Sequence, residues 1–380
     1  MPRKSETRRK VCLVTGTRAE FGLMRTALEA IRSHPGLELQ IVCTGMHLDP
    51  AHGRTIETVR SGGWTVDAEV TWEPSGDSRS KTAVSTGRAM AVLADTFERL
   101  GSEIVLVVGD RVEAFAAAAA GHVSGKVVAH VHGGDRALGQ VDDSLRHAIT
   151  KLAHVHFPAT KRSAARIVRM GEDRWRVMRV GSPGVDRIRS VAARWPGLRG
   201  RRYALLVLHP TSADAGLEQS RAAMVAKIVG DIGLDRIVIV YPNNDPGSTG
   251  IIDQWESLAG DERFVVRRDV PRAQFLGLMR DAAVMIGNSS SGIIEAASFG
   301  TPVVDIGPRQ AGRERSGNVV TVPFDPAKVR RALSAVWNGG TPRRSAAANV
   351  YGGGGAGRRI AAALSRLDVN DRLLRKLVAY

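Results

Sequence analysis

Residues 287–305 read G-N-S-S-S-G-I-I-E-A-A-S-F-G-T-P-V-V-D, and this stretch decides how the second half of the chain is interpreted. An apolar run from Ala282 to Ile286 breaks into small polar residues before Ile293 resumes the apolar pattern. We therefore predict a strand, a tight turn, a helix and a further strand. Hydroxyls and backbone N–H groups at such a helix N-terminus, where the peptide dipoles align, favour a bound phosphate.

The turn residues Ser289, Ser290, Ser291 and Gly292 would face such an anion, and Glu295 lies one turn into the predicted helix. A carboxylate repels phosphate but accepts hydrogen bonds from a ribose diol. The pattern therefore fits the phosphates and the sugar of a nucleotide. The alternative is an ordinary serine N-cap followed by a buried strand–helix unit.

Short apolar strands alternate with amphipathic helices along the chain, which indicates parallel sheets because parallel strands need crossover connections. In the first half we predict strands at 11–15, 39–44, 104–108, 127–131 and 177–180, and helices near 20–32, 80–100, 112–123 and 142–153. The pattern restarts at Tyr203, with strands at 204–208, 236–241, 264–266, 284–286, 302–306 and 319–322, and later helices at 326–337 and 357–379. The predicted fold class is α/β, with two Rossmann-like, doubly wound parallel-sheet domains.

The chain has 380 residues, enough for two domains of ordinary size. We place an N-terminal Rossmann-like domain at 1–182, a linker at 183–202 and a C-terminal Rossmann-like domain at 203–355. The glycine run at 352–355 would let the last helices, within 356–380, pack back against the N-terminal domain.

Composition argues against several classes of protein. No apolar run reaches the roughly 18 residues of a membrane span, and the basic segment Met1 to Lys10 lacks a signal-peptide core, so we expect a cytoplasmic protein without membrane association. The net charge is +16, but the arginines are scattered and not interleaved with aromatic residues, which favours steering of an anionic substrate over nucleic-acid binding. Cys12 and Cys43 lie in predicted strands, and their spacing forms neither a disulfide framework nor a zinc site.

Polar residues recur where the predicted strands end, and open parallel sheets bind their ligands at that edge. They are Arg18, His47, Asp110, Arg111, His132 and Asp135 in the first half, and His209, Asn243, Asn244 and the serine turn in the second. Any one of them could be a helix cap or an ordinary loop residue. Together they predict a cleft between two domains, lined with cations and carboxylates.

Several motifs carry a resemblance to a known family. They are G-T-R-A-E-F-G (16–22), V-G-D-R (108–111), H-G-G-D (132–135), V-D-D-S-L-R-H-A-I-T-K-L-A-H (141–154), L-H-P (208–210), Y-P-N-N-D-P-G-S (241–248), the serine turn, and R-Q-A-G-R-E (309–314). In these motifs the chain resembles the hydrolysing UDP-N-acetylglucosamine 2-epimerases, including the branch that acts on UDP-N,N'-diacetylbacillosamine. The likeness runs from Val11 to the last helices.

The resemblance implies a GT-B-like pair of Rossmann-like domains with UDP held mainly by the second. It implies a UDP-activated N-acetylhexosamine substrate, loss of UDP from C1 and of the proton from C2 to give a 2-acetamidoglucal, and addition of water with C2 inverted. The product is a free N-acetylmannosamine-type sugar, with one or two acetamido groups, for nonulosonic acid synthesis. Relatives also imply a homo-oligomer, either a dimer or a tetramer.

The resemblance maps functional roles onto individual residues. Binding of UDP and sugar falls on Arg18, His47, Arg111, His209, Asn244, Ser290, Ser291, Gly292, Glu295 and Arg313, with Glu295 on the ribose. Proton transfer falls on Asp110, His132, Asp135 and Asp142. Asp110 is the first choice for the essential carboxylate, although it could instead cap the helix that begins near Val112. Asp142 is preferred to Asp143, and the choice among these carboxylates and His132 for the second proton transfer stays open.

The chain departs from part of the family at three places. Some members, notably the animal bifunctional enzyme, read H-I-E-G-G-E where this chain has His132 in H-V-H-G-G-D, although histidine also exchanges protons near neutral pH. The tail reads Y-G-G-G-G in place of Y-G-D-G, and one extra residue lies between Gly134 and Asp142.

Other functions are weighed against the same motifs. In non-hydrolysing 2-epimerases the stretch that corresponds to residues 132–150 resembles E-A-G-L-R-T followed by P-E-E-x-N-R, and this chain has neither motif. G-T-R-A-E-F-G is not the G-x-G-x-x-G of NAD-binding proteins, and the ten histidines show no close ligand spacing, so we expect no cofactor and no metal. A non-hydrolysing epimerase, a GT-B glycosyltransferase that uses a UDP-sugar, and a non-catalytic sugar-nucleotide sensor stay open as alternatives.

Overall fold

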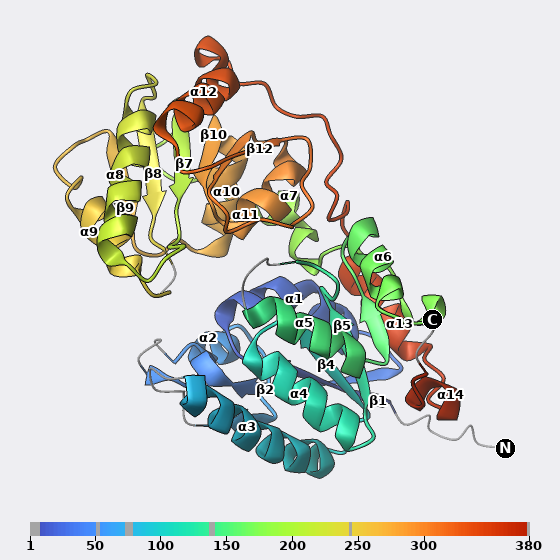
Figure 1. Ribbon diagram of the computed structural model, residues 1–380. Helices are drawn as coiled ribbons and strands as arrows, with labels where there is room; N and C mark the ends of the chain where they lie inside the picture. The colour runs from blue at the N-terminus through green and yellow to red at the C-terminus, as the bar shows by residue number, and fades with distance from the viewer. Residues whose placement is uncertain (1–7, 51–53, 73–78, 137–140, 243–244, 378–380) are drawn as a thin grey trace. The chain divides into compact units, whose positions relative to one another are not determined.

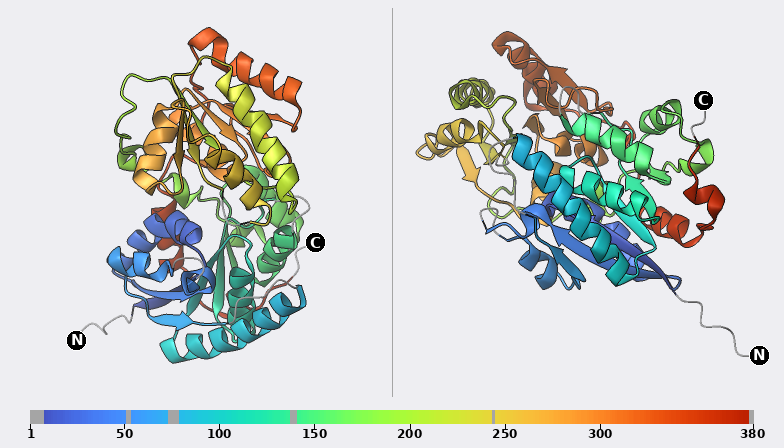
Figure 2. Two further views of the ribbon diagram at one scale, coloured as in Figure 1. Left: turned by 90° about the vertical axis from the view of Figure 1, so that its left-hand side faces the viewer. Right: turned by 60° about the horizontal axis from the view of Figure 1, so that its bottom comes forward.

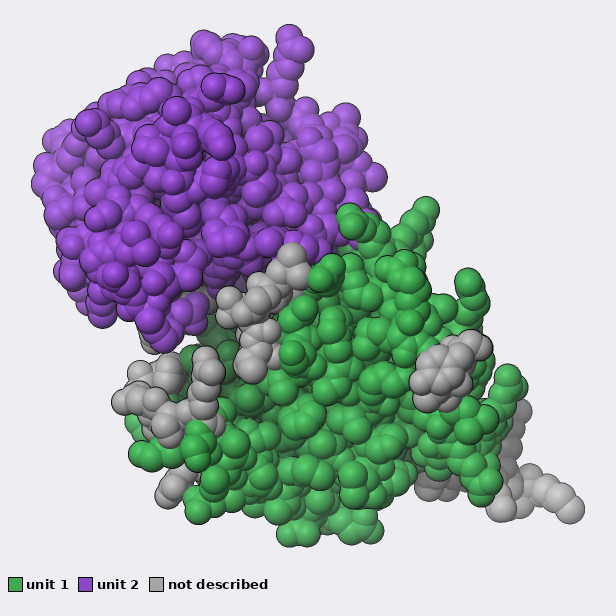
Figure 3. All heavy atoms as spheres, in the orientation of Figure 1, with its two compact units in different colours: residues 1–186, 354–380 green, residues 187–353 purple. Residues whose placement is uncertain are grey.

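The computed structural model describes residues 8–50, 54–72, 79–136, 141–242 and 245–377. The chain divides into two compact units, coloured separately in Figure 3. The first unit is formed by Met1–Asp186 together with Gly354–Tyr380, and the second by Arg187–Gly353. Each unit is built on one six-stranded sheet.

The first sheet has the strand order of a doubly wound fold. Its strands are β1 (Arg9–Thr15), β2 (Leu37–Thr44), β3 (Ala68–Val70), β4 (Ile104–Val108), β5 (Val127–Val131) and β6 (Val155–Phe157). They are parallel and follow the order β3-β2-β1-β4-β5-β6 (Figure 1). The order changes direction between β1 and β4, and such sheets bind ligands beyond the carboxyl ends of the strands at this point.

Helices cover both faces of the first sheet (Figures 1 and 2). One face packs against α3 (Arg79–Leu100), α4 (Val112–Val123) and α5 (Val141–Leu152), and the other packs against α1 (Arg18–Arg32) and α13 (Ala356–Ser365). Shorter helices are α2 (Ile56–Ser61), α6 (Lys161–Arg169) and α14 (Asp371–Leu374). The small side chains of Ala116 to Ala120, all buried, let α4 lie close against the sheet.

The second sheet repeats the arrangement. Its strands are β7 (Tyr203–Val207), β8 (Arg236–Val240), β9 (Phe264–Arg267), β10 (Val284–Gly287), β11 (Val303–Ile306) and β12 (Val319–Val322). All are parallel, in the order β12-β11-β10-β7-β8-β9, so the change of direction falls between β7 and β10. Its helices are α7 (Ile188–Val191), α8 (Ala215–Gly230), α9 (Ser248–Glu256), α10 (Arg272–Asp281), α11 (Ser290–Ile294) and α12 (Pro326–Trp337), with a 3-10 turn η5 (Ala296–Phe299) after α11.

The predicted α/β class with two Rossmann-like parallel sheets is confirmed, with local corrections. The predicted strand at 177–180 is wrong, because Val177 forms only an isolated bridge with His156 of β6. The predicted helix at 357–379 is also wrong in length: it ends at Ser365, and Asn370 caps a separate short helix by accepting a hydrogen bond from the Leu373 N–H. The predictions lacked β3 and β6, which have three residues each.

Buried polar side chains join the end of the chain to the first unit. Arg176 is 2% exposed and donates to the carbonyl groups of His154, Leu373 and Arg372 at 3.1, 2.7 and 2.8 Å. Asp186 accepts hydrogen bonds from the first two N–H groups of α13, those of Ala356 and Gly357. These contacts explain why the C-terminal residues belong to the first unit.

Among the described residues, none of the helices combines the length and the apolar content that crossing a bilayer requires.

Candidate active site

The serine turn lies at the carboxyl end of β10, where the second sheet changes direction. Ser289 is the N-cap of α11, and its hydroxyl lies 2.8 Å from that of Ser291. All three serines are half-buried, so the turn is not part of the core. Helix α11 has only five residues, so its dipole is small, and the hydroxyls and N–H groups are the donors that matter.

Gly292 is closely packed at the same turn. A Cβ atom at this position would lie 3.2 Å from Cγ1 of Val303 on β11, which is tighter than ordinary contact. The glycine therefore lets the start of α11 lie directly against the sheet.

Asn288 joins the two strands at which the second sheet changes direction. Its side-chain amide accepts from the His209 N–H at 2.7 Å and donates to the His209 carbonyl at 2.9 Å, and Asn288 is 1% exposed. Gln310 donates to the Asn288 carbonyl at 2.8 Å. The serine turn and His209 are therefore held together by a buried amide that the sequence predictions did not single out.

His209 is a neutral imidazole at physiological pH. It is 6% exposed, and burial, followed by the nearby charge of Arg309, lowers its pKa to about 3. A neutral ring can donate or accept one hydrogen bond per nitrogen but contributes no positive charge to a phosphate site.

Arginines supply the positive charge beside the serine turn. Arg309 lies 3.3 Å from the Asn288 carbonyl and 3.8 Å from the Asp245 carboxylate, and Arg313 is half-buried four residues further on. Arg315 is paired with the buried Asp305 at 3.1 Å. Arg309 belongs to the R-Q-A-G-R-E motif, so the signal was present in the sequence, although only Arg313 was predicted from it.

Glu295 is buried and paired. It is 7% exposed, and Oε1 accepts a hydrogen bond from Arg272 at the start of α10 at 2.7 Å. The arginine neutralises a carboxylate that would otherwise oppose an anion in this turn. Arg272 was not predicted, because the two residues are 23 positions apart and no local pattern connects them.

In the first unit, Asp110 follows β4 and forms an ion pair with Arg146 of α5. Arg146 is 3% exposed and also donates to the His132 carbonyl at 3.1 Å. The N-cap position of α4 is Arg111, and it makes no side-chain capping bond. The carboxylate of Asp110 is therefore held by an arginine, which differs from the capping role considered as its alternative.

His132 and Asp135 form a buried pair at the carboxyl end of β5. His132 Nδ1 lies 2.9 Å from Asp135 Oδ2, and Nε2 lies 2.9 Å from Ser182 Oγ. The second oxygen of Asp135 accepts from Ser163 Oγ at 2.6 Å. His132 has a φ of 62°, a left-handed conformation that is uncommon for a residue with a side chain and concentrates at functional sites.

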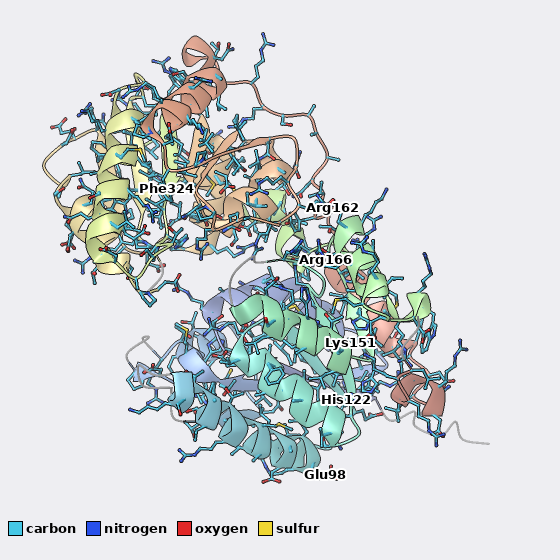
Figure 4. The ribbon with its side chains drawn as sticks, in the orientation of Figure 1. Glu98, His122, Lys151, Arg162, Arg166 and Phe324 are labelled. Atoms are coloured by element: carbon cyan, nitrogen blue, oxygen red, sulfur yellow. The ribbon has the colours of Figure 1, made fainter. Side chains whose placement is uncertain are left out.

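The loop after His132 is held from the neighbouring helix. Arg166 of α6 donates to the Gly134 carbonyl, and Figure 4 shows where this side chain lies on α6. A Cβ atom at Gly134 would lie 2.4 Å from the Ser163 carbonyl oxygen, and φ there is 75°, so glycine is required.

Three other predicted residues lie at the ends of β1, β2 and β4. Arg18 is exposed at the first position of α1. Arg111 is paired with Glu113, with Nε 3.2 Å from Oε2. His47 is fully buried between Thr15 and Thr55, at 3.2 and 2.8 Å, and burial lowers its pKa to about 4. Its position links strand ends and does not face solvent.

Two predicted residues fall at the limits of the described structure. Asn244, with Asn243, lies outside the described residues, and so does the side chain of Asp142, although its backbone belongs to α5. The neighbouring Asp143 lies 3.8 Å from Nε2 of His147. Within the described part of the chain, no group of three or more His, Cys, Asp or Glu residues is arranged to hold a metal ion.

Two doubly wound sheets, each with polar residues at the point where its strand order changes direction, define a GT-B-like α/β protein. The chain belongs to the UDP-N-acetylglucosamine 2-epimerase family, whose sequence profile matches residues 29–365. This confirms the resemblance at the level of the family.

Known relatives cover nearly the whole chain. A UDP-N,N'-diacetylbacillosamine 2-epimerase (hydrolyzing) from Legionella pneumophila is 34% identical over 98% of this chain and 100% of its own length. A UDP-N-acetylglucosamine 2-epimerase from Neisseria meningitidis serogroup B is 33% identical over 86% of each chain. The crystal structure of a UDP-GlcNAc 2-epimerase from Neisseria meningitidis bound to UDP-GlcNAc superimposes with a TM-score of 0.77 at 18% identity, over 93% of this chain and 99% of that one.

Proposed function

We propose that this protein is a hydrolysing 2-epimerase that converts UDP-N-acetylglucosamine, or a diacetamido relative, into UDP and a free N-acetylmannosamine-type sugar. The observation that carries the proposal is the chain of contacts from Asp110 through Arg146 to His132 and Asp135. It gathers carboxylates and an imidazole at the carboxyl ends of β4 and β5, where a doubly wound sheet binds its ligand. The Legionella relative, which is named as hydrolysing, supports this reaction type.

The first chemical requirement is stabilisation of the departing diphosphate. The hydrogen on C2 is only weakly acidic until UDP leaves C1 and the ring becomes oxocarbenium-like. We assign this stabilisation to the cations Arg18, Arg111 and Arg313 and to the hydrogen-bond donors of Ser290 and Ser291. Arg309, which was not predicted from the sequence, is assigned the same role because it lies beside the serine turn. Fixed donors and cations aimed at developing negative charge are the usual means of lowering such a barrier.

The nucleotide itself is assigned to the second unit. Gly292 permits close approach, Glu295 accepts hydrogen bonds from the ribose, and His209 and Asn244 complete the binding residues. His209 donates or accepts as a neutral ring, in agreement with its lowered pKa. In this proposal His47 contributes by holding the ends of β1 and β2, because its side chain is fully buried.

The second requirement is two proton transfers at the sugar. Asp110 is proposed as the essential carboxylate, oriented by the guanidinium of Arg146. His132 is the candidate for the second transfer, with Asp135 fixing the ring orientation through Nδ1 in the way a carboxylate orients an imidazole in catalytic triads. Asp142, at the start of α5, is the alternative candidate.

The pathway and the assembly are further parts of the proposal. A free N-acetylmannosamine-type product would supply nonulosonic acid synthesis in the cytoplasm, and we propose a homo-oligomer. The reaction as proposed consumes water and the UDP-sugar and requires no cofactor.

The non-hydrolysing reaction is the second candidate, because the meningococcal relative is named only as a UDP-N-acetylglucosamine 2-epimerase. Incubation of the pure protein with UDP-N-acetylglucosamine, or with its diacetamido analogue, followed by ³¹P NMR, distinguishes the two. The proposal predicts accumulation of UDP and a free sugar. Accumulation of a second UDP-sugar supports the non-hydrolysing reaction, turnover only with an added acceptor supports a glycosyltransferase, and binding without turnover supports a sensor. The more rapidly consumed analogue identifies the substrate.

A further inference from the structure

We infer that Glu113 is a positioning residue that aims the guanidinium of Arg111 at the leaving diphosphate. This inference rests on the proposed function, in which Arg111 stabilises the departing UDP. Glu113 is not among the residues to which the family motifs gave a role. Its place in the structure gives it one.

Glu113 meets Arg111 through two parallel contacts. Oε2 accepts from Nε of Arg111 at 3.2 Å and Oε1 accepts from a terminal guanidinium nitrogen at 3.3 Å. The carboxylate is 4% exposed, whereas the arginine side chain is 41% exposed. A two-point contact with a buried partner fixes the plane of the guanidinium and leaves the arginine at the surface, where an anion can reach it.

Two glycines form the slot that holds this carboxylate. A Cβ atom at Gly16, which follows β1, would lie 2.8 Å from Glu113 Cδ, and one at Gly45, which follows β2, would lie 2.5 Å from Oε1. Neither strand end could carry a larger residue without displacing Glu113. The slot therefore lies at the carboxyl ends of β1, β2 and β4, which includes the point where the first sheet changes direction.

A second carboxylate, that of Glu20, lies close to Glu113. Glu20 lies in the same region and accepts from the Gly16 N–H at 2.9 Å. Burial, followed by the charge of Glu113, raises the pKa of Glu20 to about 7. The charge of Arg111 acts in the opposite direction on the pKa of Glu20, and Glu113 holds this arginine by two contacts.

A purely structural role makes a different demand. An acidic residue in the first turn stabilises a helix by its favourable interaction with the helix dipole. This interaction is available at the surface and requires neither burial nor a glycine slot. The effect of Glu113 on nucleotide binding therefore separates the two roles.

The test uses variants that disturb Glu113 directly and through the slot. Glu113→Gln keeps the shape and removes the charge, and Gly16→Ala pushes the carboxylate aside without altering either member of the pair. Gly16 does not have a positive φ, so alanine is sterically allowed by the backbone. Gly87→Ala on α3 is the matched control, because a Cβ atom there meets nothing within 4 Å.

We expect Glu113→Gln and Gly16→Ala each to lower kcat/KM roughly tenfold to hundredfold, as misplacement of a binding group does. The dissociation constant of UDP should rise while the melting temperature changes little, and Gly87→Ala should match the wild type. Glu113→Ala removes the side chain with which a Cβ atom at Gly16 would clash. Adding Gly16→Ala to Glu113→Ala should therefore lower kcat/KM no further. The double variant Arg111→Ala with Glu113→Gln should have the same kcat/KM and the same UDP dissociation constant as Arg111→Ala alone.

Additive effects in either double variant, or tighter UDP binding by Glu113→Gln, would overturn the inference. Failure of the proposed function is seen separately, because the wild type would then release no UDP from the sugar nucleotide. In that case the UDP dissociation constants of the same variants still test the coupling between Glu113 and Arg111.

Discussion

Arg146 connects Asp110 and His132, two of the groups proposed to move protons. It is 3% exposed, forms the ion pair with Asp110 and donates to the carbonyl of His132, so it fixes the ends of β4 and β5 relative to each other. A buried guanidinium costs free energy unless its donors are paired, and two donors of Arg146 are paired in this way, with the Asp110 carboxylate and the His132 carbonyl.

Asp110→Asn should lower turnover by about a hundredfold or more, in the range of a lost general acid or base, with UDP affinity nearly unchanged. Steady-state kinetics and UDP titration calorimetry measure the two effects, and Asp95→Asn on the exposed side of α3 is the control. Loss of UDP affinity together with activity would show that Asp110 serves structure.

Glu295→Ala should weaken UDP binding roughly tenfold, because hydrogen bonds from the ribose to a charged acceptor are lost, while kcat changes less. Arg272→Ala is the companion variant, since it leaves the carboxylate but removes its partner at 2.7 Å. An unchanged UDP dissociation constant in Glu295→Ala would remove the ribose assignment.

The residue types of the site were predictable, but their partners were not. Asp110, His132 and the serines stand out because they follow apolar strands, and that is a local signal. Ser182, Arg146 and Arg272 meet their partners only after folding, across 50, 36 and 23 positions of the chain. A single sequence contains no local signal that predicts such contacts between distant residues.

At the level of elements, strands of four or more residues were predictable and three-residue strands were not. β4 matches its predicted bounds because its apolar run is continuous and ends at Gly109, and β5 matches although His130 interrupts its run, because four apolar residues remain. β6 was missed because it has only three residues, of which two are apolar; the third, His156, is fully buried and hydrogen-bonded to Glu172 at 3.1 Å. The C-terminal segment was predicted as one helix because nothing local showed the contacts of Arg176.

Arg176→Ala should detach the segment around α14, because the carbonyls of Arg372, Leu373 and Arg375 lose their donor, and an unsatisfied buried carbonyl such as that of Leu373 costs roughly 1–3 kcal/mol. Hydrogen exchange of residues 371–377 should increase by more than that of β1 or β4, and the melting temperature should fall. Arg174→Ala, at an exposed neighbouring position, is the control. Unchanged protection of this segment in Arg176→Ala would contradict the assigned contacts.

For the whole molecule, buried histidines set the response to acid. Burial lowers the pKa of His47 to about 4 and those of His130, His154 and His209 to about 3. The pKa of His156 is also lowered by burial. In the unfolded chain all five titrate near the ordinary value of 6.5, so below that pH the unfolded state binds more protons than the folded state.

The free energy of unfolding should therefore fall as pH falls below about 6.5, by about 1.4 kcal/mol per pH unit for each such histidine. The loss continues until the folded-state pKa values are reached. Calorimetric melting curves at several pH values between about 8 and about 5 check the sign and the steepness. A melting temperature that stays constant or rises over that interval would contradict the burial of these rings.

In the proposed reaction, UDP departs and the C2 proton is removed before water adds to the sugar. The most direct measurement is proton NMR of the pure protein incubated with UDP-N-acetylglucosamine in deuterated water. We predict UDP and free N-acetylmannosamine that carries deuterium at C2. Free sugar that retains its original hydrogen at C2, or UDP-N-acetylmannosamine as the accumulating product, would contradict it.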